Sequence, residues 1–212
     1  MPRSKLSREL VLAAALRLAD DEGIAGLSMR RLGQAMGVEA MSLYKHVAGK
    51  EEILDGIADL VMHEVAVPAR DMPWRAALRQ SAISTHEALL RHPWAGPVLE
   101  SRRNPGPARM QYLDAVVSIL LDAGFSLPDV ARAFMAVDSQ VYGFTMMILA
   151  FPFDLRDAPK EARIMADEVF GAAYPGLRAM ARLAVAGPGV PLEFEFGLDL
   201  VLDGLEARLA AR

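Results

Sequence analysis

The chain contains no cysteine. Without thiols it can form neither a disulfide framework nor a cysteine-ligated zinc site. It also lacks any run of about 18 consecutive apolar residues, the length that spans a bilayer. Its longest apolar stretch, Phe144–Phe153, is interrupted by Pro152 and predicts a buried helix. The first residues, MPRSKLSREL, are basic and polar, unlike a secretory signal. We therefore expect a cytoplasmic protein that has no membrane partner.

Motifs of catalysis are missing as well. The sequence has no nucleophile elbow, no Glu-x-x-His metal motif and no Gly-rich phosphate loop. Its four histidines, His46, His63, His86 and His92, are not spaced as metal ligands. These absences argue against a helical enzyme, and we expect no metal and no cofactor.

Charge is unevenly distributed along the 212 residues, 53% of which are hydrophobic. Residues 1–50 hold eight Lys/Arg and five acids, a net charge of +3, whereas the remainder holds 15 Lys/Arg and 22 acids, a net charge of -7. A basic segment on an acidic body is typical of a small nucleic-acid-binding module joined to a part that does not touch nucleic acid.

Apolar residues recur at helical spacing along the whole chain, and no segment alternates with the period of a strand. The predicted fold class is all-α. The expected helices span about residues 8–23, 28–37, 39–47, 50–67, 74–92, 94–103, 108–123, 127–149, 159–174, 175–185 and 191–212. Serines at positions 7, 28 and 126 are suited to cap three of these helices, and Gly37 is suited to end another.

The segment Gly37–Lys50, GVEAMSLYKHVAGK, combines a tight turn with a short helix. Leu43 and Val47 lie on one side of this helix, and Ser42, Tyr44, Lys45 and His46 lie on the other. Two helices joined by a tight turn that contains glycine are typical of helix-turn-helix units, whose second helix enters the DNA major groove. We expect this segment to read DNA.

Two prolines, Pro68 and Pro73, interrupt the helical pattern and mark the best candidate boundary. We expect a helix-turn-helix DNA-binding domain over residues 1–50, with its last, connecting helix running on to about residue 67. Residues 74–212 are then expected to form a larger helical domain for effector binding and dimerisation.

The run LSMRRLGQAMGVEAMSLYKHVAGKEEILDGIADLV, Leu27–Val61, resembles the N-terminal domain of Tet-repressor (TetR) family regulators. The segments WRAALRQSAISTHEALLRHP, QYLDAV, AGFSLPDVARA and AVDSQVYGF resemble the tetracycline-repressor branch of that family. The resemblance implies a homodimer whose helical C-terminal domain binds a small molecule and thereby releases a DNA operator.

The resemblance also implies roles for individual residues. Ser28 would cap the second helix near a phosphate, and Arg30 would contact DNA from that helix. Ala40, Met41 and Ser42 stand where the family reads base edges. The expected contacts to the DNA backbone come from Tyr44, His46 and Lys50, with Lys45 beside them. Ala40 and Met41 cannot make bidentate contacts to bases, although a methyl group can contact thymine. A different operator from that of the tetracycline repressor is therefore expected.

The effector site is expected to differ from that of tetracycline-binding relatives. Ser81 replaces their amide, Thr85 replaces an aromatic residue, and their metal-binding histidine falls at about Leu99, so a tetracycline–magnesium chelate is not expected. The candidate pocket is lined by Met110, Leu113, Val117, Phe134, Met135, Asp138 and Tyr142. An apolar pocket with one acid and one phenol suits a hydrophobic ligand, either neutral or cationic. Asp138 is the strongest indication, because an unpaired buried carboxylate is costly.

Two helices per subunit are expected to form the dimer, about residues 127–149 and 191–212. On the last helix, the stripe of Phe194, Leu198, Val201 and Leu205 is the expected contact surface. The predicted function is therefore a DNA-binding transcriptional repressor that a small hydrophobic ligand releases from a palindromic operator. A helical adaptor or ligand-binding protein without sequence-specific DNA binding is the alternative.

Overall fold

The computed structural model describes residues 6–102, 105–152, 155–186 and 193–211, and in these ranges it contains helices and connections but no strand. The predicted all-α fold class is confirmed. None of these helices is long and apolar enough to cross a membrane. The α-helices are α1 Arg8–Gly26, α2 Met29–Met36, α3 Ala40–Leu43, α4 Lys50–His63, α5 Trp74–Arg91, α6 Ala95–Ser101, α7 Pro107–Asp122, α8 Leu127–Leu149, α9 Ala158–Ile164, α10 Pro175–Ala186 and α11 Phe194–Ala210.

Side-chain and glycine caps set several of these boundaries. Ser7 Oγ accepts a hydrogen bond from Leu10 N–H, and Ser28 Oγ accepts one from Arg31 N–H. Gly37 follows α2 with φ 66°, in the left-handed region that glycine enters without strain. Gly23 (φ 71°) interrupts the helical backbone within α1. The capping serines at positions 7 and 28 and the glycine stop at position 37 lie where the sequence predicts them.

Helix α3 is shorter than the predicted 39–47. The carbonyl of Leu43 accepts hydrogen bonds from the amides of both His46 (2.9 Å) and Val47 (3.1 Å), so the segment after Leu43 continues as a turn. The next amide, Ala48 N–H, donates to the carboxylate of Glu52 at 2.7 Å. The chain is thus bent toward α4 before a longer helix can form.

Helix α4 ends at His63 and does not continue to residue 67. Beyond α4, the backbone of Ala66 is held by α5: its amide donates to Ser84 Oγ at 2.9 Å, and its carbonyl accepts from Ser81 Oγ at 2.8 Å. These side chains satisfy backbone groups that a longer helix would have used.

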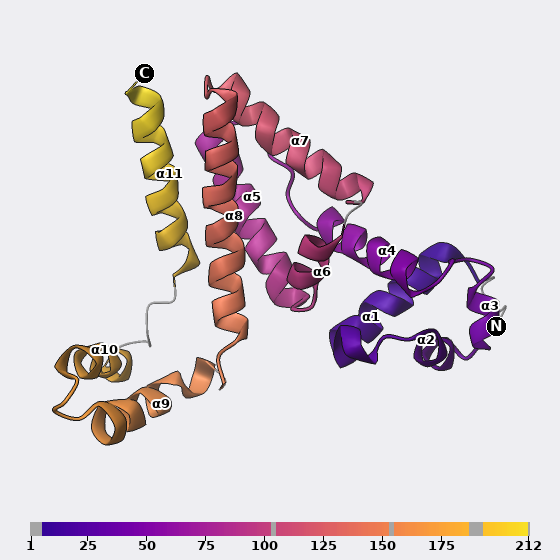
Figure 1. Ribbon diagram of the computed structural model, residues 1–212, viewed down its shortest axis with the longest axis horizontal. Helices are drawn as coiled ribbons and strands as arrows, with labels where there is room; N and C mark the ends of the chain where they lie inside the picture. Colours follow the sequence, from indigo (N-terminus) through magenta and orange to yellow (C-terminus); the bar gives the residue numbers. More distant parts are fainter. Residues whose placement is uncertain (1–5, 103–104, 153–154, 187–192, 212) are drawn as a thin grey trace.

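Figure 1 shows α1, α2 and α3 gathered at one end of the molecule, with α4 leading from them to the remaining helices. We call α1–α3 the head, and α5–α8 together with α11 the body. In the body, α5, α8 and α11 pack on one another, and α7 packs on both α4 and α8. Fully buried leucines fill this core, among them Leu78, Leu89, Leu120, Leu198 and Leu202.

The orientation of α11 differs from the prediction. Phe194, Leu198 and Leu205 are buried against the body, so most of the stripe expected at a dimer contact is core. The exposed apolar residues are Phe196 (65% exposed) and Leu200 (58% exposed), one turn apart.

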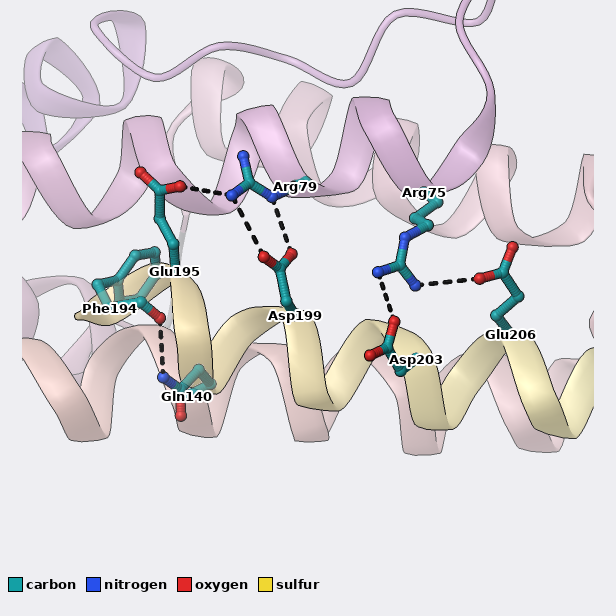
Figure 2. Close-up of polar contacts among 8 residues, drawn as sticks. All are labelled: Arg75, Arg79, Gln140, Phe194, Glu195, Asp199, Asp203 and Glu206. Atoms are coloured by element: carbon teal, nitrogen blue, oxygen red, sulfur yellow. Dashed lines mark hydrogen bonds and ion pairs between the residues drawn. The ribbon is translucent and has the colours of Figure 1, made fainter.

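A row of ion pairs accompanies this orientation (Figure 2). Arg79 of α5 binds Asp199 through two hydrogen bonds of 2.8 and 3.3 Å and also pairs with Glu195. One turn earlier, Arg75 pairs with Asp203 (2.6 Å) and Glu206 (3.2 Å). The acidic face of α11 is therefore turned toward α5, and Phe196 and Leu200 are left on the surface.

The predicted helix over residues 159–174 is divided in the structure. Helix α9 ends at Ile164, a π-helical turn follows over Met165–Phe170, and Gly171 (φ 50°) reverses the chain before α10. In Figure 1, α9 and α10 form a hairpin beyond the ends of α8 and α11.

Candidate functional site

Helix α3 rests on α2 through a contact that only glycine allows. A Cβ atom on Gly33 would lie 2.9 Å from the carbonyl oxygen of Val38 and 3.2 Å from the amide of Ala40. Beneath α3, Leu32, Leu43 and Val47 are buried. The turn and α3 are therefore held firmly on α2, which fixes the direction of the outward side chains.

The outward side of α3 and of the turn after it carries six of the side chains that the sequence assigns to DNA. Met41 is 75% exposed and Tyr44 is 47% exposed. Lys45 is also exposed, while Ala40, Ser42 and His46 are partly buried. The structure thus gathers these six residues on one short segment at the end of the head.

The start of α2 presents two arginines in different situations. Arg31 pairs with Glu22 of α1, which uses its charge within the protein. Arg30 is exposed, and no acidic partner is recorded for it among the residues that the structure places. Ser28 is exposed at the N-terminus of α2, where its Oγ accepts from Arg31 N–H at 3.2 Å. Ser28 and Arg30 therefore remain available to a ligand near α3.

Lys50 begins α4, and its ammonium group donates to the carbonyl of Ile24 at 3.2 Å. This carbonyl lies directly after the backbone break at Gly23. The helix dipole disfavours a positive charge at the N-terminus of α4, and the hydrogen bond from Lys50 to Ile24 offsets this effect. The α4 backbone amides nearby can still face an anion.

Sequence reasoning did not identify Glu52 and Arg8 as part of this region. Glu52 accepts from Ala48 N–H at 2.7 Å and from Arg8 Nε at 3.0 Å, and these contacts lower the pKa of its carboxyl. The carboxylate ties the turn after α3 to both α4 and α1. Glu52 stands at the third position of α4, from which an acidic side chain can reach back to a backbone amide before the helix, and this position could have indicated its role.

A second polar site lies in the body around Asp138 of α8. Burial raises the pKa of the Asp138 carboxyl from 3.8 to about 6, and the negative charge of Glu100 adds to this effect. Burial also raises the pKa of the phenols of Tyr112 and Tyr142, so both are neutral donors at physiological pH. Asp138 and Glu100 both act on the Tyr142 phenol, which places these groups in one neighbourhood.

The nearby cation does not neutralise Asp138 directly. The guanidinium of Arg109 donates to the carbonyl of Leu99 and pairs with Glu100 at 2.7 Å. No hydrogen bond or ion pair to Asp138 is recorded among the described residues. A half-buried carboxylate is therefore left next to two phenols without a cation in contact.

The predicted effector residues separate into two groups. Asp138 and Tyr142 lie in the polar site, and Leu113, Val117 and Phe134 are partly buried against the core. Met110 (53% exposed) and Met135 (63% exposed) point to the surface, so the structure does not bring them together with the others.

Tyr112, which sequence reasoning did not select, is buried between α7 and α5, where Thr85 and Ser81 act on its hydroxyl. The signal for it was a phenol on α7 and two hydroxyl residues one turn apart on α5.

A helix pair joined by a glycine turn, a short second helix with an outward polar face and a separate helical body together define a helix-turn-helix DNA-binding regulator. Residues 11–57 match the family model described as "Bacterial regulatory proteins, tetR family". Residues 67–209 match the model described as "Tetracyclin repressor-like, C-terminal domain". The chain belongs to the TetR family and is a DNA-binding transcriptional regulator, which confirms the resemblance found in its sequence.

Relatives match along nearly the whole chain. The HTH-type transcriptional repressor DrrR1 of Streptomyces coeruleorubidus is 34% identical over 100% of this chain and 81% of its own length. The class C tetracycline repressor protein of Escherichia coli is 32% identical over 96% of this chain and 92% of its own length. Among solved structures, a TetR regulator from Streptomyces coelicolor superposes with a TM-score of 0.77 at 27% identity, covering 96% of this chain and 99% of that one.

Proposed function

We propose that this regulator is a homodimeric repressor that binds a palindromic operator through α2, α3 and the start of α4. The observation that supports the proposal most directly is the outward face of α3, where Met41 and Tyr44 are exposed while Leu43 and Val47 anchor the segment from below. Large side chains are held in fixed directions at the end of the head, as a reading segment requires.

The residues of the reading segment divide by their chemistry. Ala40, Met41 and Ser42 offer methyl, thioether and hydroxyl groups to base edges, a set that suits thymine methyl groups better than guanine. Phosphate contacts are assigned to the polar and cationic group Ser28, Arg30, Tyr44, Lys45, His46 and Lys50. Residues 1–50, with α4 as the connecting helix, act in this proposal as the DNA-binding domain of a cytoplasmic regulator.

The dimer contact is assigned to the exposed face of α8 and α11. Phe196 and Leu200 lie on α11, and the half-exposed Met147 lies on the neighbouring α8. An apolar face on two packed helices is suited to a second copy of the same face. Two heads in such a dimer must lie one DNA turn, about 34–36 Å, apart to read both half-sites.

The effector site is assigned to Asp138, Tyr142 and Tyr112, with Leu113, Val117 and Phe134 as apolar neighbours. An effector with an apolar body and a basic group fits this set, because Asp138 has no cation in contact and the phenol rings can face a cation. Such a ligand would release the operator only by binding one arrangement of the heads better than the other.

Operator selection from random duplex DNA tests the DNA-binding part of the proposal. The expected result is a near-palindrome whose affinity falls steeply with salt. Tyr44→Ala and Lys50→Ala should each weaken binding to all sequences alike, whereas Met41→Ala should change the selected sequence. Glu168→Ala, an exposed change on the α9–α10 hairpin, is the control. If no sequence is enriched, the alternative of a helical adaptor without sequence-specific DNA binding is favoured over the repressor.

A thermal-shift screen of hydrophobic amines tests the effector part. Binding compounds should raise the melting temperature of the wild type and release the selected operator. Asp138→Asn should abolish both effects while keeping the fold. The shift should also weaken below about pH 6, where the Asp138 carboxyl takes up a proton. Equal shifts for wild type and Asp138→Asn would assign the ligand to another site.

A further inference from the structure

A partly buried cluster of polar side chains connects the head to the body away from both sites. We call Asp20, Glu64, His92 and Trp94 the latch. Asp20 belongs to α1, Glu64 directly follows α4, and His92 and Trp94 lie between α5 and α6. His92 and Trp94 are buried, and both bind Asp20.

The contacts within the latch are short and converge on one carboxylate oxygen. Asp20 Oδ1 lies 2.7 Å from His92 Nδ1 and accepts from the indole N–H of Trp94 at 2.7 Å. The other ring nitrogen of His92 lies 3.2 Å from Glu64 Oε1. Arg91 holds the second oxygen of Glu64 at 2.8 Å. Hydrogen bonds of this kind to a charged group are among the stronger ones in proteins.

The latch is a second attachment of the head. The first is α4, which leads from the head to the body and binds it through Arg102, paired with Glu51 (2.6 Å) and Asp55 (2.7 Å). The head is tied to α4 by the contacts of Glu52 with Arg8 and of Lys50 with Ile24, so rotation of the head relative to the body requires α4 to turn with it. Within the described ranges, Asp20 is the only residue of α1–α3 with a recorded hydrogen bond to the body. Its side chain therefore opposes that rotation.

We propose that His92 and Trp94 are positioning residues for DNA recognition: through Asp20 they fix the orientation of the head on the body, and thereby the spacing of the two reading segments in the dimer. The inference rests on the proposed function insofar as it requires a dimer and a palindrome. His92 and Trp94 themselves lie outside the DNA-binding and effector residues assigned above.

The latch is also close to the effector site. Trp94 precedes α6, and two residues later Gly96 packs on α8, where a Cβ atom would lie 3.2 Å from Met146 Cε and 3.8 Å from Tyr142 Cδ1. A ligand that moves Tyr142 would therefore change a contact of α6 two residues after Trp94, which holds Asp20. The same hydrogen bond that positions the head is thus placed to respond to the effector.

Affinity for operators of altered spacing tests the inference. We would titrate four proteins: the wild type, His92→Gln, Trp94→Phe and Asp20→Asn. Each is titrated with the selected operator, with operators one base pair longer or shorter at the centre, and with a single half-site. Asp21→Asn is the control, because it removes an exposed carboxylate from the next position of the same helix. All titrations are made below the melting temperature of each variant.

The wild type and Asp21→Asn should prefer the selected spacing strongly. The three latch variants should bind the selected operator about tenfold more weakly, as expected for the loss of one hydrogen bond to a charged group. Their preference for the selected spacing should shrink, while half-site affinity stays unchanged. A merely structural role would lower affinity for every DNA together, and an unchanged spacing preference in the latch variants would overturn the inference.

A measurement without DNA separates this inference from the proposed function. Because the chain has no cysteine, Gln34→Cys on α2 and Gln111→Cys on α7, both exposed, can carry a pair of spin labels. Labelled subunits are diluted with unlabelled ones, and electron–electron distances are recorded. His92→Gln and Asp20→Asn should broaden the distance distribution, and Asp21→Asn should not. Equal widths would refute the latch, whereas a broadened distribution in a protein that selects no operator would support the latch and reject the repressor.

Discussion

Replacement of Asp138 by asparagine should stabilise the protein increasingly as the pH rises. The unfolded carboxyl releases its proton near the ordinary pKa of 3.8, and the folded one only near pH 6. Between these values the folded state holds the extra proton, so stability falls as the pH rises, and the full penalty is present above pH 6. A pKa displaced from 3.8 to about 6 corresponds to a limit of about 3 kcal/mol. Asparagine cannot ionise and therefore lacks this penalty.

Urea unfolding at fixed protein concentration, followed by far-UV circular dichroism, measures the effect. The free energy of unfolding of Asp138→Asn minus that of the wild type should increase by about 2 kcal/mol between pH 4 and pH 7. Asp114→Asn, an exposed carboxylate on α7, is the control and should show no such trend. If the difference for Asp138→Asn does not depend on pH, the carboxyl is solvated in the folded protein, and its assignment to the effector site loses its basis.

Three further changes test the fold. In a double-mutant cycle, Arg79→Ala and Asp199→Asn should show a coupling free energy of about 1 kcal/mol that disappears in high salt. Because Arg79 lowers the pKa of Asp199, this coupling should also be lost as the pH falls below 3.8. A coupling that depends on neither salt nor pH would contradict the ion pair. Leu200→Asp should convert the dimer to monomers in analytical ultracentrifugation. Leu127→Asp, at a similarly exposed leucine at the start of α8, should leave the dimer intact. Dimers in both variants would place the dimer contact on another surface. Gly33→Ala should lower the free energy of unfolding by about 1–3 kcal/mol through overpacking against the Val38 carbonyl, although alanine favours helices, and a stabilised variant would show that α3 can move away from α2.

Local chemistry made much of the fold predictable. The side chains of Ser7 and Ser28 accept hydrogen bonds from free amides at helix starts, and Gly37 ends α2 in a left-handed conformation. Each effect involves only residues nearby in the sequence, so it can be predicted from the sequence. The end of α4 could not be predicted in the same way. It depends on Ser81 and Ser84, which lie on the next helix and whose partners are set by the tertiary structure.

The orientation of α11 was wrong in the prediction for a related reason. The helix has apolar residues on more than one face, and periodicity alone does not decide which of them is buried. The tertiary structure decides: Leu198 and Leu202 are buried in the body, and Arg75 and Arg79, which lie more than 100 positions earlier, pair with the acidic face of α11. Once that face is fixed, Phe196 and Leu200 are left for the surface.

The candidate sites show the same division. Asp138 could be selected because a carboxylate in an apolar helix is unusual in any arrangement of the chain. The partners of Asp20 could not, because His92 and Trp94 reach it only when the connection between α5 and α6 lies beside α1. Residues that act through distant contacts carry no local signal of their role.

The effector site at Asp138 and the latch at Asp20 contribute free energies of opposite sign to one conformational change, the movement of α6. An unpaired carboxylate at Asp138 destabilises the effector-free protein at neutral pH, and a cationic ligand would remove that penalty on binding. The binding energy so released becomes available to move α6, because Tyr142 and Met146 both lie against Gly96. Breaking the contact between Trp94 and Asp20 costs about tenfold in the equilibrium between head positions. Opening the latch also breaks the hydrogen bond between His92 and Asp20, so the total cost is about 2.8 kcal/mol at tenfold for each bond. The limit of about 3 kcal/mol at Asp138 is of the same size, so the relief of the buried charge opens the latch only when nearly all of it is transmitted to α6.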